Sequence, residues 1–94
     1  MNIFLETKNA VFYNDRVFLK RGNKIIIKAD IKEIYYLKSN VKNYFLYAKC
    51  MAIGYAYISL KKPTFFRKWY ALKMDYDDVV KIPSILDVKL TIYE

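Results

Sequence analysis

The first third of the chain consists of short segments in which β-branched and aromatic residues mix with polar ones, separated by turn-forming pairs. This pattern is typical of β-strands with one buried face. The expected strands are segments 10–13, 16–20 and 24–28. Asn14-Asp15 is a turn pair, and Gly22 and Asn23 both tolerate positive φ angles. The last two segments therefore predict a β-hairpin.

A three-residue loop at 21–23 is the preferred connection of this hairpin, because register follows the hydrophobic pattern. The apolar face of that register comprises Val17, Leu19, Ile25 and Ile27. The opposite face comprises Arg16, Lys20, Lys24 and Lys28, around Phe18 and Ile26. A two-residue loop at 22–23 would mix lysines into the apolar face.

Further strands and one late helix are expected in the rest of the chain. The expected strands are 34–38, 55–60, 67–74 and 88–93, after a single turn at 29–33. Segment 41–53 fits an amphipathic helix or an aromatic strand, and the strand is preferred. The carboxylates of 75–78 suit the first turn of a helix, and Pro83 makes that helix bend or stop by Ile82. Its apolar stripe would contain Val79, Val80, Ile82, Ile85 and Leu86.

The fold class that follows is α+β and predominantly β. We expect one domain, 1–94, with a small antiparallel sheet or a partly open barrel and one late helix. The longest apolar stretch, 44–60, contains Lys49 near its middle and is shorter than the roughly 20 residues of a spanning helix. It is read as buried core, so the chain is not expected to be transmembrane. The first six residues lack a basic segment and a long apolar run, so no signal peptide is expected.

The composition favours binding over catalysis. The chain has 17 Lys and Arg against 9 Asp and Glu, 10 Tyr, no His and a single cysteine, Cys50. Without His, neither a Ser/His/Asp nor a Cys/His arrangement can form, and a zinc site would lack ligands. The spacing of Asp75, Asp77 and Asp78 does not match an EF-hand, and helix capping is preferred there. No catalytic residue, metal or cofactor is expected.

The basic hairpin is the preferred candidate site. Its residues are Arg16, Lys20, Arg21, Lys24 and Lys28. Like charges that face each other across strands repel, so these side chains either splay into water or hold an anion between them. The candidate partners are a protein or an anionic lipid headgroup, and a cytoplasmic location is expected because one cysteine cannot form an internal disulfide.

An alternative site mixes basic and aromatic residues, as single-stranded nucleic-acid sites do. Its residues are Lys61, Lys62, Phe65, Phe66, Arg67, Lys68 and Trp69. The same residues suit a membrane interface, or Phe65 and Trp69 belong to the core. A third hypothesis is a homo-oligomer, because residues 16–49 are cationic whereas 75–94 have two basic and five acidic residues.

Segment 12–34 resembles bacterial pleckstrin-homology-like domains in its order of strand, turn, basic hairpin and the step Ile27-Lys-Ala-Asp-Ile-Lys-Glu-Ile34. Segment 70–80 resembles the last strand of that family as it enters the C-terminal helix. The resemblance spans residues 10–86 and implies two orthogonal sheets capped by a helix, with lipid-headgroup, peptide or self binding and no catalysis. Pro83 and the additional strand 88–93 depart from the family pattern.

Overall fold

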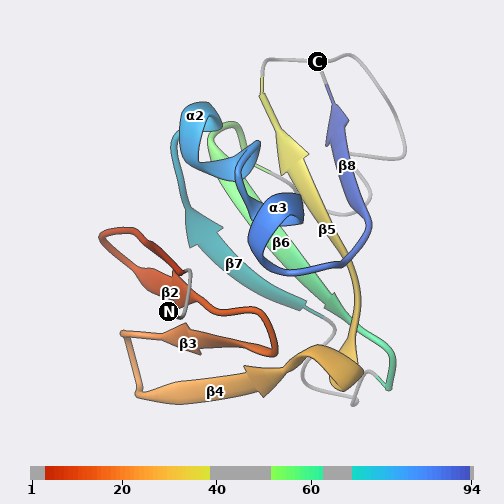
Figure 1. The fold of residues 1–94 in the computed structure, drawn as a ribbon. Coiled ribbons are helices and arrows are strands. Elements are labelled where there is room, and N and C mark those ends of the chain that lie inside the picture. The colour runs from red at the N-terminus through yellow and green to blue at the C-terminus, as the bar shows by residue number, and fades with distance from the viewer. Residues whose placement is uncertain (1–3, 39–51, 63–68, 94) are drawn as a thin grey trace.

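Two four-stranded sheets pack against each other, and the chain completes the first before it enters the second (Figure 1). The computed structural model describes residues 4–38, 52–62 and 69–93. The first sheet is a meander of β1 (Leu5–Glu6), β2 (Ala10–Phe12), β3 (Arg16–Leu19) and β4 (Lys24–Ile27). The second sheet has the order β7 (Trp69–Lys73), β6 (Tyr55–Leu60), β5 (Ile31–Leu37) and β8 (Leu90–Tyr93).

Short helical segments connect the strands at two places. A 3-10 turn, η1 (Lys28–Asp30), joins the two sheets. Two short helices, α2 (Tyr76–Val79) and α3 (Ile82–Ile85), follow β7 and lie over the second sheet (Figure 1). They return the chain to the start of β5, so β8 can pair with β5 in parallel, a geometry that needs a crossover connection.

The predicted fold class is confirmed: the described chain is mainly β, with one short bent helical segment late in the sequence. The described strands do not close into a barrel but form two separate sheets. Pro83 lies in the first turn of α3, where its missing N–H does no harm, and α2 has already ended. The predicted stripe is correct except for Val80, which is 44% exposed. Most of the ambiguous segment 41–53 lies outside the described residues.

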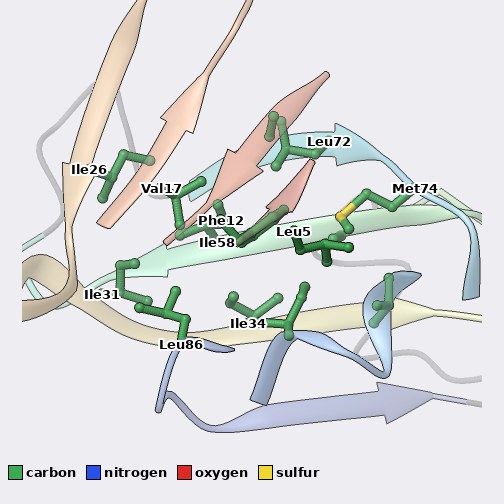
Figure 2. Packing of buried hydrophobic residues seen from close by; sticks show 14 of the residues in the cluster. Leu5, Phe12, Val17, Ile26, Ile31, Ile34, Ile58, Leu72, Met74 and Leu86 are labelled. Carbon is green, nitrogen blue, oxygen red and sulfur yellow. The ribbon is translucent and has the colours of Figure 1, made fainter. Parts of the chain in front are cut away.

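The core lies between the two sheets, and the helical segment completes it (Figure 2). Phe12 of the first sheet and Ile34 and Ile58 of the second are fully buried, as are Val79 and Leu86 from the helical segment and its end. Burying an apolar side chain of this size contributes about 1.5–3 kcal/mol. These contacts between distant parts of the chain hold the two sheets together.

The predicted register of the hairpin is wrong. Leu19 pairs with Lys24 and Val17 pairs with Ile26, so residues 20–23 form the loop, longer than either loop considered from the sequence. Gly22 and Asn23 both adopt positive φ, at 84° and 50°. The shift turns Ile26 toward the core, at 4% exposure, and turns Ile25 and Ile27 outward. Because residues 25–27 are all isoleucine, hydrophobicity alone fits either register. The length of the loop and the packing of Ile26 in the core therefore determine the register of the hairpin.

This register makes a direct prediction about stability. Replacing Ile26 by Ala should lower the free energy of unfolding by about 2–4 kcal/mol, because it leaves a cavity in the core. The same change at Ile25 should cost less than about 1 kcal/mol, because that side chain is already in contact with water. Urea unfolding of the two variants measures both values, and a larger loss for Ile25→Ala would contradict the observed register.

Candidate functional site

The outer face of the first sheet, turned away from the core, carries a row of apolar side chains that ends at Glu6 of β1. Val11, Phe18 and Ile25 lie side by side across β2, β3 and β4. Ile27 lies on the same face of β4, opposite Arg16. Ile25 is 54% exposed and Ile27 is 50% exposed. Val11 is buried and Phe18 is half-buried, so the exposed part of this row consists of Ile25 and Ile27. Two neighbouring exposed isoleucines mark a candidate interaction surface.

Aromatic rings extend this outer face toward β1. The rings of Phe4 and Tyr13 have centroids 6.0 Å apart. The guanidinium of Arg16 lies 5.0 Å from the centroid of the Tyr13 ring, within the range of a cation–π contact. The outer face therefore extends from Ile25 and Ile27 to the aromatic pair of Phe4 and Tyr13, with the Arg16 guanidinium beside the Tyr13 ring.

The five predicted basic residues do not share one face. Arg16 lies 3.5 Å from Asp15, and Lys20 lies 2.8 Å from Glu6. Lys28 lies 3.9 Å from Asp87. Arg21 and Lys24, in contrast, form no ion pair with any described residue. The predicted shared face of four cations is wrong because of the register: Arg16 and Ile25 share the outer face, whereas Lys24 is on the side of Leu19.

The space between β4 and β7, which we call the seam, contains a groove of about 750 Å³. Its described lining includes Arg21 and Lys24 from the hairpin and Tyr70, Leu72 and Lys73 from β7. A smaller hollow of about 260 Å³ continues from it, and Lys24 and Tyr70 line both. Lys62 lines the smaller hollow, so the seam combines cations from both of the sequence segments that were candidate sites.

The alternative basic and aromatic site can be followed only in part. Lys61 and Lys62 are exposed just after β6. Trp69 is half-buried, and its ring meets the Tyr57 ring edge-on at 6.0 Å. The other four residues, Phe65, Phe66, Arg67 and Lys68, lie outside the described residues. Because Trp69 and Tyr70 are consecutive in β7, they point to opposite faces, and Trp69 does not face the seam side that Tyr70 lines.

Some residues of the seam were missed in the sequence. Asn9 donates a side-chain hydrogen bond to the Lys73 carbonyl at 3.1 Å and thereby joins the two sheets at one end of the groove. Tyr55 and Tyr70 line the groove. No local signal could have found this group, because its members come from segments far apart in the chain.

Burial makes one carboxylate a candidate acid or base. Glu33 is the one buried charged residue among those described. Its carboxylate accepts a hydrogen bond from the Tyr35 hydroxyl and lies 3.8 Å from the Lys89 ammonium. Both oxygens therefore already have partners, and the arrangement stabilises the second sheet without offering an open position for a substrate.

The described residues bring together no three side chains that could hold a metal ion. Among the described helices, none has the length and apolar character needed to cross a bilayer. Comparisons with protein-family models, curated proteins and solved structures found no match to this chain. The geometry of the outer face and of the seam therefore carries the functional argument.

The contact between Glu33 and Tyr35 predicts a pH dependence. The hydrogen bond to Glu33, then burial and the carboxylate charge, raise the pKa of Tyr35 from 10.0 to about 12. The unfolded chain releases this proton near the ordinary value, so the contribution to stability is present below pH 10 and is lost as the pH rises toward 12. Glu33→Gln should bring the ionisation of Tyr35 to lower pH in an ultraviolet titration of tyrosinate.

Two further variants control this titration. Tyr35→Phe should remove the late-ionising tyrosine and so assign it. Glu6→Gln, at the exposed carboxylate that pairs with Lys20, should leave the titration as in the parent protein. An unchanged curve for Glu33→Gln would contradict the role of the carboxylate.

Proposed function

We propose that this chain is a non-catalytic binding module whose hairpin, β3 and β4 with their loop, engages an anionic lipid surface. The observation that carries the proposal is the outward direction of Ile25 and Ile27, each about half exposed, between Lys24 and Lys28. Apolar side chains flanked by lysines match the interfacial region of a bilayer, where acyl chains meet charged headgroups.

Both parts of this surface would contribute to lipid binding. Residues 16–28 contain five basic residues and no acidic residue. A Lys or Arg near an anionic bilayer contributes about 1 kcal/mol. Three of these cations are in exposed ion pairs with Asp15, Glu6 or Asp87, which are weak and can be exchanged for headgroup phosphates. Phe18 adds an aromatic ring beside Ile25 on the same face.

The order of elements also supports the proposal. A four-stranded meander is followed by the antiparallel strands β5, β6 and β7 and then by a helical segment. This is the order that the resemblance to pleckstrin-homology-like domains implies, and lipid headgroups are among the ligands of that family. The alternative, nucleic-acid binding through 61–69, has support from fewer described residues: Lys61 and Lys62 are exposed, and Trp69 is half-buried with its ring edge-on to Tyr57.

Vesicle sedimentation tests the proposal. The protein should bind vesicles that contain phosphatidylserine, bind pure phosphatidylcholine much more weakly, and lose affinity as salt screens the charges. The double variant Ile25→Ser, Ile27→Ser should weaken binding by about tenfold or more, because two half-exposed isoleucines together supply roughly 2 kcal/mol on insertion.

Val80→Ser is the matched control, since Val80 is an exposed apolar residue at the end of α2, and α2 lies away from β3 and β4 (Figure 1). It should bind vesicles like the parent protein. Failure of the parent protein to sediment with phosphatidylserine vesicles, or equal losses for both variants, would rule out the hairpin as a lipid contact. Binding of a single-stranded oligonucleotide in place of vesicles would favour the alternative function.

A further inference from the structure

The strand β7 has an open edge. It is the last strand of the second sheet, and no described strand pairs with it on the side away from β6. An unpaired edge presents backbone N–H and C=O groups that can pair with another strand. The groove of the seam lies along this edge, since Tyr70, Ala71, Leu72 and Lys73 all line it.

Two hydrogen bonds show which backbone groups face outward. The N–H of Met74 donates to the Gly54 carbonyl, at the β6 side of the strand, at 3.0 Å. The carbonyl of Lys73 instead accepts the Asn9 side-chain amide from the first sheet. Because backbone groups alternate sides along a strand, Ala71 also directs its N–H and C=O away from β6. Neither group of Ala71 has a hydrogen-bond partner among the described residues.

The side chains around this edge are cationic and apolar. Arg21, Lys24, Lys62 and Lys73 line the two hollows, and none forms an ion pair with a described residue. Asp30 is the one acidic residue in the described lining. Leu19 and Leu72 also line the groove, but both are buried in the core. The seam therefore offers backbone pairing together with cations that have no ion-pair partner among the described residues.

We propose that the seam binds an extended acidic peptide, which adds a strand to β7. Main-chain hydrogen bonds to an edge strand provide affinity in this mode of recognition, and the flanking side chains provide specificity. A peptide supplies both the acceptor for the Ala71 N–H and the donor for the Ala71 carbonyl. A DNA backbone has phosphate acceptors but no hydrogen-bond donors, so it matches only the cations.

This inference goes beyond the proposed lipid contact and uses a different surface. The lipid contact depends on Ile25 and Ile27 on the outer face of the first sheet, whereas the peptide site depends on the edge of β7. Two residues are close to both, because Lys24 lines both hollows of the seam and Ile25 lines the smaller one. Variants of Ala71 and Lys73 therefore test the peptide site alone, since both residues belong to β7 of the second sheet.

A titration of the isotope-labelled protein with a short synthetic peptide of alternating Glu and Val tests the inference. Amide shifts should appear at Ala71 and Lys73 and along the seam. Ala71→Pro removes the outward N–H without touching the β6 ladder, as proline does at an edge strand, and should weaken binding about tenfold. Ala71→Val keeps the N–H and should bind within about twofold of the parent protein.

Charge reversal gives a second test that does not depend on proline. Lys73→Glu should weaken the Glu/Val peptide by about fivefold or more and improve binding of the corresponding Lys/Val peptide, because it reverses a charge beside the added strand. Lys81→Glu, at an exposed lysine between α2 and α3, makes the same change in net charge and should bind the peptide like the parent protein.

Vesicle sedimentation of the same variants separates the two surfaces. Ala71→Pro should sediment with phosphatidylserine vesicles as the parent protein does. The peptide site is ruled out if Ala71→Pro and Ala71→Val bind the peptide equally. It is also ruled out if Lys73→Glu and Lys81→Glu weaken it equally, or if an oligonucleotide shifts the seam amides and the peptide does not.

Discussion

The burial of Ile26 determines what the hairpin presents to its surroundings. This side chain lies opposite Val17 in the core, and side chains alternate along a strand. Ile25 and Ile27 must therefore point outward, and Lys24 must lie on the side of Leu19, toward the seam. One core contact thus separates the hairpin cations between two surfaces, although they are close together in the sequence.

Much of the fold could be predicted from the sequence, because local signals specify it. The turn at Asn14-Asp15, the strand 55–60 and the interruption at Pro83 each depend on nearby residues, and the structure agrees with them. The register of the hairpin could not be predicted in this way. Residues 25–27 are all isoleucine, so hydrophobicity does not choose between them, and the choice depends on Val17 and the opposing sheet.

The candidate surfaces were predicted less well, because each depends on tertiary structure. The sequence shows that the hairpin is basic, but the outward direction of Ile25 and Ile27 follows only from the observed register. The seam is formed by residues from four separate segments of the chain, among them Asn9, Lys24, Lys62 and Lys73. The sequence shows that cations exceed acids, but not which cations are paired within the fold and which remain available to a partner.

The lysines at the two sheet edges have a consequence for specificity. Both β4 and β7 end a sheet among the described strands, and open edges favour pairing between identical chains. Lys24 at the end of one edge and Lys73 on the other would bring like charges together in such a pairing, which is unfavourable. The same charges favour an acidic strand. In the proposed peptide site these lysines would therefore both disfavour self-pairing and favour the acidic strand, because attraction to one ligand and repulsion of another both contribute to specificity.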